Sequence, residues 1–86
     1  MKVALTPEIH ARIVQYVRAG IPPRTAAGAA GVPPKVFGGW MVRGRQTSRG
    51  RYRALWDAIV QSEAQFEVEL HQRRFRVSSL LESGIA

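Results

Sequence analysis

Apolar residues near the start of the chain recur at the three- and four-residue steps of an amphipathic helix. They are Ile9, Ile13, Tyr16 and Val17. Thr6 and Pro7 suit the N-cap and the first position of such a helix, and Gly20 suits the left-handed residue that follows its end. The pattern therefore predicts a first helix that begins after Thr6 and stops near Ala19.

Two further short helices are expected over residues 24–30 and 34–42, joined by a glycine turn. A helix-turn-helix places small residues in its first helix, a glycine in the turn and apolar residues at fixed offsets. Gly31 takes the turn position, and Gly28 indicates close approach of a neighbouring backbone. The other residues that fit are Ala26, Ala27, Ala30, Val32, Phe37 and Trp40. A helical hairpin without a ligand is the alternative, because small-residue packing serves ordinary bundles too.

Nothing interrupts a helical pattern over residues 51–82, so one long helix is expected, with Ser83-Gly84 at its end. Its apolar residues alternate steps of three and four, as in a coiled-coil seam that Glu63 and Arg73 interrupt. They are Tyr52, Trp56, Ile59, Phe66, Leu70, Val77 and Leu80. A helix of about 48 Å, at about 1.5 Å per residue, is longer than the preceding residues can cover.

The two halves of this long helix are expected to have different partners. Its beginning should pack on the short helices through Tyr52, Leu55, Trp56 and Ile59. Its later apolar residues should contact other subunits: Phe66, Leu70, Val77 and Leu80. Three acids precede three arginines there, which allows neighbouring subunits to pair opposite charges: Glu63, Glu67, Glu69 and Arg73, Arg74, Arg76. The alternative is a bent helix that folds back as a hairpin.

These elements predict an all-α chain with two regions. Residues 1–50 form an N-terminal three-helix helix-turn-helix head with a basic loop, and residues 51–86 form a long C-terminal helix for oligomerisation. A chain of 86 residues is one domain at most and buries only a modest core by itself. Assembly with further copies is therefore expected on size alone.

The composition argues against an enzyme. There is no cysteine, no phosphate-binding loop and only six acidic residues, which are dispersed. We therefore expect no catalytic residue, no metal site and no cofactor. The chain also lacks an apolar run of about 18 residues and a secretory leader. Together with the absence of disulfides, this predicts a cytoplasmic protein with no membrane partner.

The net charge of +7 is unevenly distributed. Residues 1–60 contain ten Lys or Arg and two acids, a balance of +8, whereas residues 61–86 contain three Arg and four acids, a balance of −1. A strongly basic front on a helix-turn-helix indicates binding to the phosphates of nucleic acid, because neutralised phosphates release counterions. Double-stranded DNA is the expected partner.

The second helix of the predicted helix-turn-helix offers little to read base sequence. Among its outward residues only Lys35 has a donor, and bidentate Arg, Asn or Gln contacts are missing. Gly38 and Gly39 have no side chain, so either the backbone lies close to DNA there or another helix packs closely. Arg24, on the preceding helix, joins Lys35 as a candidate contact.

Residues 43–53 are the densest candidate for phosphate binding. The stretch contains five arginines and no acid: Arg43, Arg45, Arg49, Arg51 and Arg53. As a loop made flexible by Gly44 and Gly50, it can bind the phosphates of a DNA strand beside the groove or enter the minor groove. Arginine in the minor groove recognises the width of the groove. A solvated loop whose charges serve solubility is the alternative, and arginine-rich loops also bind RNA.

Residues spread over most of the chain resemble the small terminase subunits of tailed bacteriophages. The matching residues are Gly20-Ile-Pro, Ala26-Ala27, Ala30-Gly31-Val32, Phe37, Trp40, Gly44, Tyr52-Arg53, Leu55, Ile59 and Glu63-Ala64. The likeness spans about residues 5–75, and transposase and repressor heads share its front half. It implies an oligomeric, often ring-shaped adaptor that recognises viral DNA and regulates the ATPase and nuclease of the large terminase subunit.

The chain departs from that family in its length, since little follows Leu80 where family members carry a segment that engages the large subunit. Two other functions fit the same residues. One is a small transcriptional regulator or excisionase-like factor that binds as a dimer to paired half-sites. The other is the DNA-binding head of a transposase or recombinase, which would remain monomeric.

Overall fold

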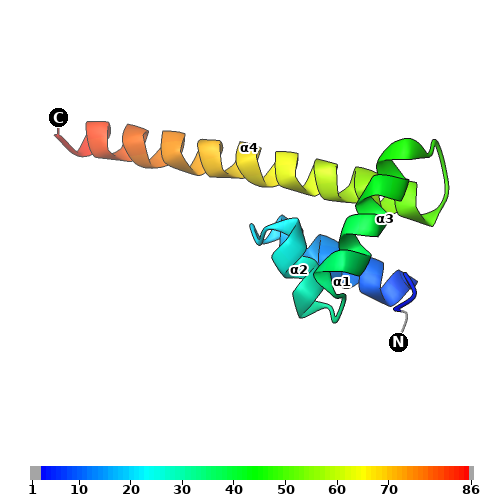
Figure 1. Ribbon diagram of the computed structural model, residues 1–86. Helices are drawn as coiled ribbons and strands as arrows, with labels where there is room; N and C mark the ends of the chain where they lie inside the picture. The colour runs from blue at the N-terminus through cyan, green and yellow to red at the C-terminus, as the bar shows by residue number, and fades with distance from the viewer. Residues whose placement is uncertain (1–2, 86) are drawn as a thin grey trace.

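Four helices make up the structure in the order α1, α2, α3 and α4 (Figure 1). The computed structural model describes the backbone of residues 3–85 and the side chains of residues 3–74. The helices are Pro7–Arg18 (α1), Pro23–Ala29 (α2), Pro34–Gln46 (α3) and Arg51–Ile85 (α4). No strand occurs in residues 3–85, which confirms the expected all-α class.

Helix α1 begins and ends where its sequence signals predict. The Thr6 hydroxyl oxygen accepts a hydrogen bond from the Ile9 backbone N–H at 3.2 Å, and Pro7 occupies the first helical position. The helix ends at Arg18, and Gly20 follows with φ +97°. A cap of this kind satisfies backbone groups that the helix ends would leave without a partner.

Helices α2 and α3 are joined by the turn that Gly31 makes possible. Gly31 has φ +88°, a conformation that is costly for residues with a Cβ. The Val32 backbone N–H then donates to the Ala27 carbonyl at 2.9 Å, which directs the chain into α3. The close backbone neighbour expected at Gly28 is absent, because no described atom lies within 4 Å of a Cβ built there.

Helix α3 is four residues longer than predicted and ends at Gln46 rather than Val42. The arginine-rich stretch is therefore mostly helical, and only residues 47–50 connect α3 to α4. Gly44 is buried inside α3 against α4: a Cβ there would lie 2.5 Å from the Tyr52 carbonyl oxygen and 2.9 Å from the Trp56 Cβ.

The expectation that Gly44 and Gly50 make this segment flexible is therefore wrong. Gly44 permits the two helices to touch, and the packing gained there offsets the weak helix propensity of glycine. Gly50, with φ +104°, forms the sharp turn directly before α4.

Helix α4 is a single helix that continues through Ser83-Gly84 to Ile85, three residues past the predicted end. In Figure 1 it runs past α1–α3 and extends well beyond them, so the alternative of a hairpin is wrong. The elongated shape of the chain, 61 × 26 × 19 Å, follows from this extension.

All four helices contribute to one core, together with the residue that precedes α1 and the turn before α3. The buried apolar residues are Leu5, Ile13, Val17, Ala26, Ala27, Val32, Phe37, Trp40, Leu55 and Ile59. From α4, Leu55 and Ile59 are buried, and Tyr52 and Trp56 are half-buried, so the expected packing of its first turns is confirmed. Ser62 is buried as well, and its hydroxyl donates to the Ala58 carbonyl at 2.7 Å.

Replacing Gly44 with alanine should destabilise the fold. The steric cost of overpacking, about 1–3 kcal/mol, exceeds the gain of about 1 kcal/mol in helix propensity, because backbone atoms of α4 cannot swing aside. Urea unfolding followed by circular dichroism measures the change in free energy of unfolding. Gly28→Ala is the matched control in open space, and it should stabilise the protein by about 0.5–1 kcal/mol. A Gly44→Ala variant as stable as Gly28→Ala would contradict the tight contact.

Candidate nucleic-acid interface

Four exposed arginines are gathered where α3 turns into α4. Arg43 and Arg45 lie in the last turn of α3, Arg49 lies in the connection, and Arg51 is the first residue of α4. We call these four residues the arginine corner. The four-residue connection keeps the two helix ends close, so tertiary structure concentrates charges that a long loop would have spread. Among residues 3–74 the ion pair Arg53–Asp57 is the only one found, so the corner carries no internal counterion.

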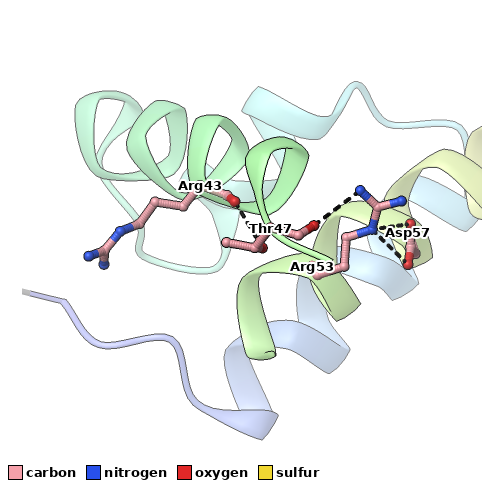
Figure 2. A network of polar contacts seen from close by, with 4 residues as sticks. All are labelled: Arg43, Thr47, Arg53 and Asp57. Carbon is pink, nitrogen blue, oxygen red and sulfur yellow. Dashed lines mark hydrogen bonds and ion pairs between the residues drawn. The ribbon is translucent and has the colours of Figure 1, made fainter. Parts of the chain in front are cut away.

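Arg53 holds the connection in place rather than belonging to the corner. Its Nε donates to Asp57 Oδ2 at 3.3 Å and lies 3.2 Å from Asp57 Oδ1, and its Nη1 donates to the Thr47 carbonyl at 3.3 Å (Figure 2). Arg53 was predicted as a DNA contact together with the other four arginines. In the structure its guanidinium has local partners, so its first role is to fix the geometry of the turn.

Arg43 has a different arrangement. Its guanidinium carbon lies 5.2 Å from the centre of the Tyr52 ring, within the range of a cation–π contact. The Tyr52 ring in turn lies 6.3 Å from the Trp40 ring, tilted by 48°. The backbone of Arg43 is also held, because its carbonyl accepts a hydrogen bond from the Thr47 hydroxyl at 3.0 Å. Its guanidinium points away from the Thr47–Arg53–Asp57 network (Figure 2).

The outer face of α3 carries four exposed residues, opposite the buried Phe37, Trp40 and Gly44. They follow one another at steps of four, three and four: Lys35, Gly39, Val42 and Gln46. Val42 exposes 46% of its surface, as do the apolar residues Val60 (46%) and Val68 (55%) on α4. Glutamine pairs well with adenine, and apolar groups contact the thymine methyl. The face therefore offers more chemistry for base readout than expected.

The sequence interpretation missed Gln46 because it ended this helix at Val42, and it missed Val42 because it weighed only the outward residues near the start of the helix. The absence of proline between Lys35 and Thr47 and the seven-residue step from Phe37 to Gly44 were the available signals. The longer helix contains Gln46 as its last residue, and the prediction that bidentate base contacts are missing stays a prediction.

Gly38 and Gly39 lie on α3 beside open space. No described atom falls within 4 Å of a Cβ built at either residue. Packing by another helix of the same chain, one of the two interpretations of this pair, is therefore absent from the described residues. The remaining interpretation is that an outside surface approaches the α3 backbone here.

Arg24 is not part of the corner. It is exposed in the first turn of α2, and in Figure 1 the start of α2 lies at the opposite end of the α1–α3 unit from the connection between α3 and α4. Lys35 is exposed in the first turn of α3, about one helix length from Arg45. The candidate DNA contacts thus fall into the corner and two isolated cations.

The predicted subunit contacts are partly used within the chain. Phe66 is half-buried, and its ring lies against Gly20, with ring carbons 2.6–3.2 Å from the place of a Gly20 Cβ. Phe66 therefore also packs within its own chain, because α4 lies on the end of α1 as far as this residue, and its contact with other subunits stays a prediction. Leu70 is also half-buried. The side chains of Val77 and Leu80 lie outside the described residues.

No group of three or more His, Asp or Glu side chains among the described residues is placed to hold a metal ion. None of the helices in the described region has the length and apolar character needed to cross a membrane.

Comparison with known proteins places the chain in no family. No protein-family model matches it, and neither the curated proteins nor the solved structures yield a match.

Gly38→Ala and Gly39→Ala should each stabilise the isolated protein by about 1 kcal/mol, because alanine is the better helix former and nothing obstructs its Cβ. Chemical denaturation of the single variants and of the parent protein measures the effect. Loss of stability in either variant would show that α3 is packed more closely there than the described atoms indicate.

Proposed function

We propose that this chain binds double-stranded DNA, chiefly through its phosphates, and serves as an oligomeric adaptor of viral genome packaging like the small terminase subunits. The arginine corner is the observation that supports this best. Four exposed guanidinium groups without an internal counterion form a surface suited to a polyanion. Arginine is also the residue best adapted to phosphate, because its planar fork donates two hydrogen bonds at once.

The proposal assigns α2 and α3 to a helix-turn-helix with α3 in the major groove. The turn at Gly31 and the exposed outer face of α3 support this assignment. Gly38 and Gly39 let the backbone of α3 approach the duplex, while Lys35 and the corner contact phosphates on either side. Sequence preference is then weak, with Val42 and Gln46 as its main source.

In this function the long helix α4 assembles copies, so that many weak DNA contacts act together. The α4 backbone extends far beyond the short helices, which supports a role outside the monomer. A ring is one form the assembly can take. Regulation of a large terminase subunit belongs to the proposal, and the chain itself has no catalytic role in it.

A small helix-turn-helix transcriptional regulator or excisionase-like factor is the second candidate. The outer face of α3 favours it specifically, because Gln46 and Val42 supply side chains able to discriminate bases. A regulator binds one paired site far more tightly than unrelated duplexes, whereas the adaptor binds different duplexes with similar affinity. A standalone transposase or recombinase head is a third candidate, and it requires a monomer.

Replacing Arg43, Arg45, Arg49 and Arg51 together with alanine should weaken DNA binding across all sequences. Log affinity falls linearly with log salt concentration, and each lost phosphate contact should make this decrease less steep by about 0.9. Fluorescence anisotropy with several unrelated duplexes over a salt series measures both effects. The change lowers the net charge from +7 to +3.

A matched pair of double variants controls for net charge: Arg45→Ala/Arg49→Ala in the corner, and Arg12→Ala/Arg18→Ala at two exposed arginines elsewhere. Both double variants have the same net charge, so any general effect of charge appears in both. Unchanged affinity of the corner variant at low salt, or an equal loss in the two double variants, would refute the assignment. A monomer by light scattering at working concentration would exclude the adaptor.

A further inference from the structure

A groove lies between α4 and the segment that links α1 to α2. Its volume is about 330 Å³, and one of its walls is the Ile21-Pro22-Pro23 connector. Its apolar lining includes the buried Val17 and the half-buried Phe66 and Leu70, which we call the floor, and its exposed acidic residues Glu63 and Glu67 form the rim. Contact of Phe66 with Gly20 holds the floor in position, so the groove exists before any partner binds.

The acids beside this groove have no cation of their own. Glu63, Glu67 and the neighbouring Glu69 are exposed, and none forms an ion pair within residues 3–74. Arg18, from the end of α1, and Arg73 line a neighbouring pocket together with Glu69. An apolar groove with a carboxylate rim fits an amphipathic helix that carries arginine beside its apolar residues.

The end of α4 has this chemistry. Arg73 and Arg74 are exposed, and the sequence continues with Arg76 among Phe75, Val77, Leu80 and Leu81. Because α4 is one continuous helix, its end points away from the groove of its own chain and cannot enter it (Figure 1). The same segment of another copy can.

We propose that the groove of each copy receives the end of α4, residues 73–81, from a second copy in a reciprocal antiparallel pair. The inference rests on the proposed function in one respect, since it specifies how the copies of the proposed oligomer contact each other. A two-fold axis at Leu70 brings Leu70 against its counterpart and places Glu67 opposite Arg73, each three residues away from the axis. It also places Glu63 opposite Val77, beside Arg76. The same patch then serves both copies, as a two-fold interface requires.

Charge order along α4 selects this arrangement. Acids come first and arginines follow, so two helices side by side in the same direction and register would oppose like charges. Antiparallel pairing opposes unlike charges at both ends of the contact. It also buries Leu70 and the exposed flank of Phe66, the half-buried apolar residues at the point where α4 leaves α1.

Two charge-reversed variants test the pair. Glu63→Lys/Glu67→Lys gives a basic groove facing a basic tail, and Arg73→Glu/Arg76→Glu gives an acidic groove facing an acidic tail. Each alone should self-associate at least about tenfold more weakly than the parent, because every exchanged pair turns from attraction to repulsion. Mixed in equal amounts, they should assemble again, since both contacts of the mixed pair are attractive.

Analytical ultracentrifugation and native mass spectrometry measure these assemblies, and circular dichroism shows that the variants fold. Glu8→Lys and Arg12→Glu/Lys35→Glu change charge away from the groove and should leave assembly unaltered. The mixed sample should contain pairs with one copy of each variant. Failure of the mixture to reassemble, or undiminished assembly of either variant alone, would overturn the proposal.

DNA binding by the same variants separates this inference from the proposed function. The arginine corner is intact in both, so weakened self-association with retained DNA binding of the single copies supports the docking by itself. Assembly that persists in both charge-reversed variants overturns the docking and leaves the adaptor in place. A monomeric parent protein overturns both, while phosphate binding stays testable through the corner variant.

Discussion

The fold depends on the close approach of α3 to α4 at Gly44. A glycine there lets the backbone of α4 at Tyr52 lie against α3, which no side chain at this position would permit. The tilted rings of Trp40 and Tyr52 and the guanidinium of Arg43 lie beside the contact, and Arg53 ties the connection to Asp57 and Thr47. The contact holds α3 against α4, with the four arginines of the corner on the helix ends and the connection beside it.

The same contact gives the chain a packed end and an extended end. Short helices and the first turns of α4 bury one core, while the rest of α4 extends beyond it. Positive charge is concentrated at the corner, and the acids lie further along α4 beside an apolar groove. One end is thus suited to a polyanion and the other to a basic helix. A small domain that cannot bury much surface by itself gains stability from such a partner.

In the proposed function, assembly and DNA binding support each other. A surface of four arginines gives modest, salt-sensitive affinity, and linking copies raises it without any new contact. The reciprocal pair is compatible with a dimeric regulator and with a larger adaptor built from pairs. The exposed Val42 and Gln46 of α3 bear on the same choice, because base readout favours the regulator.

Helix positions, the glycine turn at Gly31, the apolar core and the excess of positive charge followed from the sequence alone, because periodicity, capping residues and charge are local properties. Tertiary contacts decided the rest. Gly44 looked like a flexible residue until α4 was placed against it, and this packing extended α3 to Gln46. Arg53 looked equivalent to its neighbours, yet its distance from Thr47 and Asp57 gave it local partners. Phe66 was expected at a subunit contact, and the path of α1 placed Gly20 beneath it. For Gly44 and Phe66 the deciding neighbour lies on another helix, and for Arg53 the Thr47 carbonyl lies across the turn, where the spacing of residues along the chain carries no information. The Arg53–Asp57 pair is different, because its i,i+4 spacing on one helix is visible in the sequence.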